Sequence, residues 1–290
     1  MRWVKFLLKF LFSLIVILLA SGLPVLVGGF AAGELRLEIY FRTIRDVLES
    51  LWPVQDIAIM NFRAQQEMPL FPDIFAYISY SLQILTLAII AAVVTALVFT
   101  VLTMMLPDRW REQVKLALYF LESIPDLLVI MLAQLAVIAF FKKTGILVSS
   151  IAVLGDDRIY WLPVLCLMIL PMIQLYRLSM LTFQEEERQL YVEFARSLGY
   201  SKAITVLLHM FRNAMTSVFF QSKKTVWFML SNLFVLELMF NLPGIILFWQ
   251  ENMTPEVFLV TVLSFFLPVF ILYSIGEWYF LRRLYGREIV

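Results

Sequence analysis

The side chains that could carry out covalent or metal chemistry are few in this chain. Its 290 residues contain one histidine, His209, and one cysteine, Cys166. A single imidazole makes neither a zinc protease site nor a Ser-His-Asp site, and a lone thiol in an apolar run forms neither a disulfide within the chain nor a metal cluster. The phosphate-binding pattern G-x-x-x-x-G-K-[ST] does not occur. We therefore expect no catalytic site, metal or cofactor in this chain, and any energy it uses must come from a partner.

Polar side chains inside long apolar runs are the second group that could do chemistry. Such groups are unfavourable within a membrane, so each is a candidate functional residue. Glu237 has two open interpretations: a structural hydrogen bond or packing at a gate, and direct contact with a substrate amine. Gln134, Gln174 and Asn232 are weaker candidates for the pathway, and contact between helices is the alternative role of each. Arg177 is expected to extend its side chain to the cytoplasmic face.

The composition predicts a bilayer around these residues. The chain is 62% hydrophobic and only 16% charged, which is typical of an integral membrane protein. A spanning helix needs about 20 mostly apolar residues. Six runs reach this length: 6–30, 78–106, 116–141, 159–182, 224–248 and 256–281. We predict an all-α integral membrane protein whose six transmembrane helices form one domain over residues 1–290.

The distribution of Lys and Arg predicts the orientation, because positive residues collect on the cytoplasmic side of a membrane. With the N-terminus inside, the cytoplasmic segments hold fifteen of these residues and the outer segments hold seven. Both termini and segment 183–222 are then cytoplasmic. An alternative for the first run is a cleaved signal peptide, since a basic start precedes the apolar residues 10–20 and the small Ser21-Gly22. Its removal would leave the later orientations unchanged.

Segment 33–76 is the longest polar stretch on the predicted outer side. Its apolar residues recur loosely at helical intervals up to Leu51, and Trp52-Pro53 ends that pattern. Asp73 is available to cap the helix that follows. Two interpretations stay open for this external insertion: a small cap that packs on the spans, and a docking surface for an external binding protein.

The cytoplasmic segment 183–222 has the pattern of two helices around a glycine turn. The predicted first helix begins near Glu185, Glu186 and Glu187, with their carboxylates at the positive end of its dipole, and runs to about Leu198. Gly199 is expected to end this helix in the left-handed conformation, and Ser201 to cap the next one. The second helix is predicted to carry an apolar stripe of Ile204, Leu207, Leu208 and Phe211, with Lys202 and Arg212 in water. An amphipathic loop lying on lipid is the alternative.

The same segment carries an ordered set of residues around Gly199. Glu193, Ala195 and Gly199 follow the order E-x-A-x3-G, and His209-Met210-Phe211-Arg212-Asn213-Ala214 closes the set. This set resembles the coupling loop of binding-protein-dependent ABC transporter permeases, and its ending resembles their oligopeptide/dipeptide (peptide/nickel) branch. Two further stretches resemble the same family, namely Glu122-Ser123-Ile124-Pro125-Asp126 and Glu237-Leu238-Met239-Phe240-Asn241-Leu242-Pro243-Gly244.

The resemblance implies a type I ABC importer permease fold with a cytoplasmic coupling helix, in a bacterial cytoplasmic (inner) membrane. It implies half of a translocation pathway for peptides or similar small solutes. The expected partners are two ATP-binding subunits, a second homologous permease subunit and an extracytoplasmic substrate-binding protein, with no nucleic acid. The residues expected at the ATPase contact are Glu193, Ala195, Gly199, Ser201, His209, Arg212 and Asn213. Ala195 is expected to fit a cleft of the ATPase that admits no larger side chain.

Two other functions stay open. One is a membrane sensor or receptor component that keeps the permease fold without bulk transport. It is motivated by segment 33–76, which lacks the G-D-P and G-D-x-G pieces common in this branch, and by Ile246, which stands where the usual P-G-x-G ends in glycine. The other is an ion-coupled secondary transporter, which predicts inverted repeats with Gly/Pro-interrupted spans in matching halves. The sequence has no such repeats.

Overall fold

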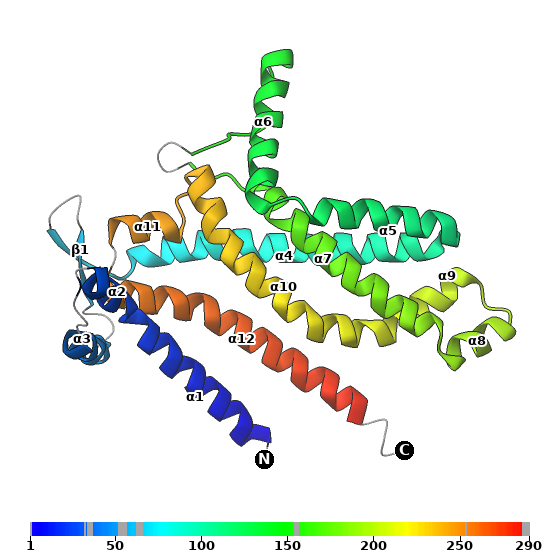
Figure 1. Cartoon of the computed structure of the whole chain (residues 1–290), viewed down its shortest axis with the longest axis horizontal. Helices are drawn as coiled ribbons and strands as arrows, with labels where there is room; N and C mark the ends of the chain where they lie inside the picture. The colour runs from blue at the N-terminus through cyan, green and yellow to red at the C-terminus, as the bar shows by residue number, and fades with distance from the viewer. Residues whose placement is uncertain are drawn as a thin grey trace. The chain divides into compact units, whose positions relative to one another are not determined.

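The computed structural model of the chain describes residues 2–31, 33, 37–51, 57–61, 66–153, 157–252 and 254–285 (Figure 1). The chain divides into two compact units. The first unit consists of Met1–Leu82 and Pro243–Leu272, and the second unit of Gln83–Leu242 and Tyr273–Val290. A single transmembrane domain over residues 1–290 stays a prediction.

Among the described residues, six helices are long and apolar enough to cross a membrane, as predicted. They cover Phe6–Val27, Asp73–Met105, Asp126–Thr144, Trp161–Glu187, Lys202–Phe240 and Pro255–Arg282. The shortest has 19 residues, and a helix of that length is close to the hydrocarbon thickness of about 30 Å. The protein therefore has an all-α membrane fold.

The third span begins later than the predicted run 116–141. The predicted residues are divided between α5 (Asp108–Glu122) and α6 (Asp126–Thr144). Pro125 separates the two helices, because it has no N–H for a helical hydrogen bond and disfavours the helical conformation in the residue before it. Its carbonyl accepts the first hydrogen bonds of α6. With 15 residues, α5 is too short to span a bilayer.

The fifth span also differs from the predicted run 224–248. α10 (Phe211–Phe240) ends at Asn241, whose backbone is left-handed with a φ of 48°. Asn adopts this conformation more readily than most residues that carry a Cβ. Pro243 follows, and α11 (Ile245–Glu251) is a separate short helix. Single residues that break a helix thus decide where both of these spans begin or end.

The first unit joins N-terminal helices to α11 and to the first part of α12 (Pro255–Tyr285). Its helices at the N-terminal side are α1 (Arg2–Ser21), α2 (Leu23–Ala31) and α3 (Leu37–Ser50). α1, α3 and α12 meet in an apolar core that contains Ile17, Val47, Leu259 and Phe266. The Tyr40 hydroxyl also donates a hydrogen bond to the Leu19 carbonyl at 2.9 Å, which ties α3 to α1.

Segment 33–76 contains α3 and a short hairpin that the sequence patterns did not predict. β1 (Ala58–Asn61) pairs antiparallel with β2 (Gln66–Pro69). α3 ends near the predicted break, although Trp52-Pro53 itself lies outside the described residues. Asp73 is the first residue of α4 (Asp73–Met105), one position later than the predicted cap.

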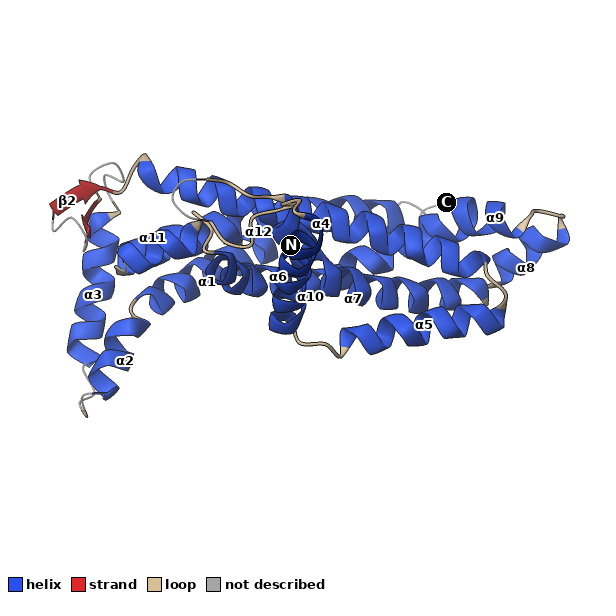
Figure 2. Cartoon of the chain, turned by 90° about the horizontal axis from the view of Figure 1, so that it is seen from above, coloured by secondary structure: helices blue, strands red, loops and turns tan. Residues whose placement is uncertain are grey.

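α7 (Trp161–Glu187) lies at the centre of the second unit, where it packs against α10, α5 and α6 (Figure 2). Half of its most apolar stretch is buried, compared with 11% for α6. The large side chains Tyr176, Met180 and Phe183 are fully buried along it. α6 instead projects away from α5 and α7 (Figure 1). α7 is therefore the central packing partner of α5, α6 and α10 in this unit.

Candidate functional site

α8 (Leu190–Ser197) is a two-turn helix that ends in a glycine turn. The Gly199 backbone has a φ of 84°. Its N–H bonds to the Arg196 carbonyl at 3.0 Å, and the Tyr200 N–H bonds to the Ala195 carbonyl at 3.2 Å. These two bonds form a Schellman motif, which favours glycine because a Cβ is strained at positive φ. The predicted end of the helix at a left-handed glycine is confirmed.

The predicted position of the three glutamates is wrong. Glu185, Glu186 and Glu187 form the last turn of α7, because that helix continues from the membrane span. Carboxylates at the negative end of a helix dipole are unfavourable. Their compensation comes from contacts with neighbouring elements: Glu186 accepts a hydrogen bond from the Tyr191 hydroxyl, and Glu187 forms ion pairs with two arginines.

Tyr191 anchors the start of α8 to both flanking helices. Its hydroxyl interacts with Glu186 at the end of α7 and with Asn213 in the first turn of α10. Burial of the hydroxyl and its bond to Glu186 raise the pKa of Tyr191 to about 12. The side chain therefore stays a neutral donor at physiological pH. Asn213, expected at the ATPase contact, has a partner within this chain.

The second helix of the segment starts as predicted and then departs from the α-helical pattern. The Ser201 hydroxyl accepts a hydrogen bond from the Ile204 N–H at 3.4 Å and caps α9 (Lys202–Ile204). A π-helix, Thr205–Met210, follows. It has more residues per turn than an α-helix. The buried side chains are Thr205, Val206 and Met210, whereas Ile204, Leu207 and Leu208 are exposed. Three of the four residues of the predicted apolar stripe are therefore exposed, and Phe211 is partly buried.

The residues expected at the ATPase contact lie on different sides of the segment. Glu193 and Arg212 are exposed, and His209 is partly buried with its ring 5.6 Å from that of Tyr200. Ala195 is only 4% exposed. Ala195 thus packs against this chain's own atoms, and its fit in a cleft of the ATPase stays a prediction.

Lys202 is also placed differently from the prediction. It is partly buried and donates a hydrogen bond to the Leu106 carbonyl, between α4 and α5, at 3.1 Å. The expectation that this side chain stays in water is wrong, because the sequence pattern of one helix does not reveal an acceptor 96 positions away.

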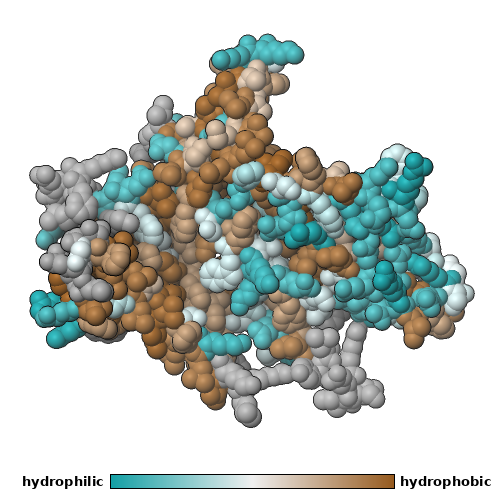
Figure 3. Space-filling view, in the orientation of Figure 1, coloured by the Kyte–Doolittle hydropathy of each residue, from teal (hydrophilic) through white to brown (hydrophobic). Residues whose placement is uncertain are grey.

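An exposed apolar face surrounds the glycine turn. Six large apolar side chains are between 46% and 81% exposed, namely Leu190, Phe194, Leu198, Tyr200, Leu207 and Leu208. We call these six residues the apolar face. Hydrophilic residues gather over the same end of the second unit (Figure 3), and large apolar side chains exposed in such surroundings mark an interaction site. The i, i+4, i+8 spacing of Leu190, Phe194 and Leu198 is the sequence signal that could have revealed it.

The other end of α10 is joined to α6 by side-chain amides. The Gln134 amide donates to the Ile151 carbonyl at 2.9 Å and to the Met239 carbonyl at 3.1 Å. The Asn241 amide donates to the Val153 carbonyl at 2.8 Å. These bonds connect α6, the end of α10 and the chain that follows α6. Gln134 therefore makes the contact between helices that was the alternative to a pathway role.

The remaining polar residues within the spans are distributed along the helices. Glu237 lies in the last turn of α10 and is 1% exposed, and Gln174 in α7 is partly buried. Asn232 hydrogen-bonds with Asp126 at the start of α6, which also joins two helices.

Arg177 pairs with a glutamate as well as reaching solvent. Its Nη2 lies 3.2 Å from Glu122 Oε1, and its side chain is 51% exposed. The prediction of a side chain that only extends to the cytoplasmic face is therefore incomplete, because α5 brings a carboxylate next to it.

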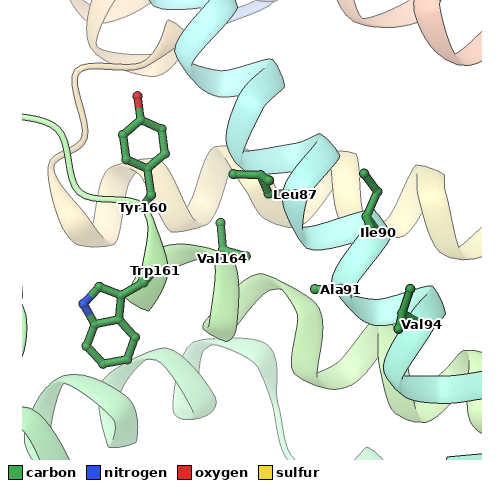
Figure 4. A pocket seen from close by; sticks show the side chains of 7 residues that line it. All are labelled: Leu87, Ile90, Ala91, Val94, Tyr160, Trp161 and Val164. Carbon is green, nitrogen blue, oxygen red and sulfur yellow. The ribbon is translucent and has the colours of Figure 1, made fainter. Parts of the chain in front are cut away.

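An apolar hollow of about 500 Å³ lies on the second unit between α4 and the start of α7. Figure 4 shows its lining, Leu87, Ile90, Ala91, Val94, Tyr160, Trp161 and Val164. The Tyr160 hydroxyl donates to the Gln83 side chain at 3.1 Å. The hollow offers dispersion contacts to an apolar group and carries no group for chemistry.

Comparison with known proteins relates these features to one family. A family model described as the inner membrane component of binding-protein-dependent transport systems matches residues 85–283. The match includes α8, the glycine turn, the apolar face and the Glu237 region. No curated protein matched the chain. Because the match covers well over half of a chain with six apolar spans, the protein belongs to the binding-protein-dependent transport system inner membrane components, the permease subunits of ABC transporters.

Proposed function

We propose that this ABC transporter permease subunit imports peptides or similar small solutes, as half of a pathway completed by a second, related permease subunit. The family implies ATP-binding and substrate-binding components as partners, and in this proposal a separate subunit hydrolyses the ATP. Both termini and α8 lie on the cytoplasmic side, where the excess of Lys and Arg belongs. α8 is then on the side of the membrane that holds ATP.

The observation that carries the coupling role of α8 is the apolar face. Phe194 is 64% exposed and Leu190 is 81% exposed, on a helix whose other side is buried against its own chain. A subunit that covers these side chains removes them from water, which favours association. Glu193 is exposed on the same helix and supplies a charged contact at the rim. Closure of the ATP-binding subunits then moves α8, and α7 and α10 carry the movement into the membrane.

Peptide cargo is supported by the resemblance of H-x-x-R-N-A to the oligopeptide/dipeptide branch and by Glu237. A carboxylate within a span is a default candidate for a functional contact, and an unmodified peptide carries an N-terminal amine that complements it. Glu237 is 1% exposed. An amine therefore reaches it only after the surrounding helices move, as alternating access requires.

Co-purification from detergent tests the coupling role. Phe194→Glu places a charge in the centre of the apolar face, and Phe41→Glu is its control on α3, because Phe41 is 62% exposed and Phe194 is 64% exposed. We expect wild type and Phe41→Glu to retain the ATP-binding subunits, and Phe194→Glu to retain about ten-fold less, a loss typical of a central apolar contact. Equal retention by both variants would show that α8 is not the contact.

Uptake by the reconstituted transporter tests the cargo. Proteoliposomes that contain both permease subunits and the ATP-binding subunits, with the binding protein added outside, receive labelled dipeptides and longer oligopeptides. We expect accumulation that requires ATP and fails when the peptide N-terminus is acetylated. ATP-dependent accumulation of a sugar or an amino acid in place of peptides would reject the peptide assignment and leave the permease role intact.

A further inference from the structure

One carboxylate joins three helices next to α8. Glu187 is the last residue of α7, and its side chain is 19% exposed. Its Oε2 accepts a hydrogen bond from Arg111 of α5 at 2.9 Å, and its Oε1 accepts one from Arg196 of α8 at 2.8 Å. The two oxygens of a single side chain thus hold helices that are far apart in the sequence.

Arg111 is the buried member of this group. It is 5% exposed, and arginine is stable in such a position only with partners that satisfy its charge and its donors. In addition to Glu187, its Nη1 lies 3.5 Å from Asp108 Oδ1, and its Nη2 donates to the Met104 carbonyl at 3.2 Å. Arg111 therefore connects the last turn of α4 to the end of α7.

A second connection lies beyond the glycine turn. Lys202 Nζ donates to the Leu106 carbonyl at 3.1 Å. Arg196 comes before Gly199 and Lys202 comes after it. Lys202 binds the junction of α4 with α5 directly, whereas Arg196 reaches it through Glu187 and Arg111. The start of α5, α8 and α9 lie at the same end of the second unit in both views (Figures 1 and 2). We call Arg111, Glu187, Arg196 and Lys202 the Glu187 cluster.

We propose that Arg111 and Glu187 are positioning residues that make α8 and the junction of α4 with α5 move as one body during transport. This inference rests on the proposed coupling role of α8. Chain connectivity joins α8 only to α7 and α10, whereas the Glu187 cluster adds α4. A displacement of α8 then reaches the second span directly. An arginine buried between these elements transmits the displacement because separating it from Glu187 would leave a charge without its partner.

A distance measurement in the complete transporter tests whether these elements move together. Spin labels are attached at Gln113 on α5 and Ser197 on α8, both exposed, after the buried Cys166 is replaced by alanine. We expect the same narrow distance distribution in the nucleotide-free and ATP-trapped states of the otherwise wild-type protein. In Arg111→Met, which keeps the Glu187–Arg196 pair, we expect the distribution to shift and broaden in the ATP-trapped state.

The amount of cargo transported per ATP hydrolysed gives the functional readout. We expect Arg111→Met to retain its ATP-binding subunits and to lower this ratio about ten-fold, within the usual range of coupling between sites. Arg109→Met is the matched control, because Arg109 is exposed on the same helix, and it should equal wild type. If Arg111→Met fails to fold, Arg111→Met with Glu187→Leu replaces the buried pair by apolar side chains, a change that proteins commonly tolerate.

The outcomes separate this inference from the proposed function. An unchanged distance distribution and a wild-type ratio in Arg111→Met, or in the double variant, would overturn the inference while α8 remains the ATPase contact. Failure of the wild-type protein to retain ATP-binding subunits would overturn the proposed function and the inference together. The expected result is a Gln113–Ser197 distance that stays fixed in wild type and changes in Arg111→Met, together with less cargo transported per ATP in that variant. This result would establish the Glu187 cluster as part of the coupling route.

Discussion

The two ends of α10 lie beside contacts of different chemistry. Near its start, charged side chains of the Glu187 cluster connect α5, α7 and α8. Near its end, the neutral amides of Gln134 and Asn241 bind backbone carbonyls. The first end also exposes the apolar face, whereas at the second end Phe240 is fully buried.

This difference indicates which end is sensitive to salt. Amide-to-carbonyl bonds are directional and respond little to salt, so they hold α6 to α10 in one arrangement. Partly exposed ion pairs are screened by salt, and another charge can replace either partner. The charged end thus combines a buried pair, Arg111–Glu187, that holds its own helices together, with exposed apolar side chains that a second protein covers in the proposed function.

The largest expected effect on stability comes from removing the carboxylate of Glu187, which Arg111 and Arg196 share. Glu187→Gln leaves the buried Arg111 with only the exposed carboxylate of Asp108 at 3.5 Å, and the loss of the main partner of a buried charge lowers the free energy of unfolding by about 3 kcal/mol. Thermal unfolding in detergent, followed by size-exclusion chromatography, measures the difference. Glu185→Gln is the control on an exposed residue of the same turn. Equal melting temperatures for the two variants would mean that charge does not stabilise this end.

Removing the amide donor of Gln134 should lower the free energy of unfolding less than Glu187→Gln does. Gln134→Met has a similar size but leaves the Ile151 and Met239 carbonyls without this donor, and we expect a loss of about 1 to 2 kcal/mol for the two bonds. The same unfolding assay, run at low and high salt, should give the same loss at both ionic strengths. A loss that falls strongly with salt would contradict the distinction between the two ends.

Comparison of Gly199 with Gly145 distinguishes the effect of backbone strain on folding from an effect on contact with the ATP-binding subunits. Gly199 and Gly145 both have positive φ, and a Cβ at either would meet no atom within 4 Å among the described residues. Alanine at each position should therefore lower the free energy of unfolding by a similar amount, about 1 kcal/mol. We expect only Gly199→Ala to lower the recovery of ATP-binding subunits as well. Equal recovery of ATP-binding subunits by both alanine variants would show that the glycine turn serves folding alone.

The smallest expected effect on stability concerns the hydroxyl of Tyr191 and appears only at high pH. Burial raises its pKa from 10.0 to about 12 in the folded protein. A folded pKa above the unfolded one gives stability that is complete below pH 10 and lost as the pH rises toward 12. The difference in stability between wild type and Tyr191→Phe should thus be constant up to pH 10 and change above it. A difference that stays constant through pH 11 would contradict the raised pKa.

The features that could be predicted from sequence are those that depend on many residues or on one local preference. Six spans follow from long apolar runs, and the glycine turn follows from the backbone freedom of Gly199. The bounds of the third and fifth spans were missed, because Pro125 and Asn241 break helices within stretches that are otherwise continuous in hydropathy.

The candidate site was harder to predict, because its contacts join distant segments. Arg111 and Glu187 are 76 positions apart, and neither has a distinctive neighbourhood in the sequence. The π-helix itself was not predicted, since hydropathy patterns assume one turn per 3.6 residues. Burial of Ala195 likewise depends on how α8 packs against its own chain, which composition does not reveal.

The length of α4 has a consequence for the surrounding lipid. Its 33 residues extend about 50 Å, compared with about 30 Å for the hydrocarbon layer. Roughly a dozen residues therefore stand in the headgroup regions, or the helix tilts to bring more of them into the hydrocarbon. Because α4 is longer than the hydrocarbon layer, it adjusts to a thicker or thinner bilayer by changing its tilt. A hydrophobic mismatch of a few ångströms therefore leaves this span embedded.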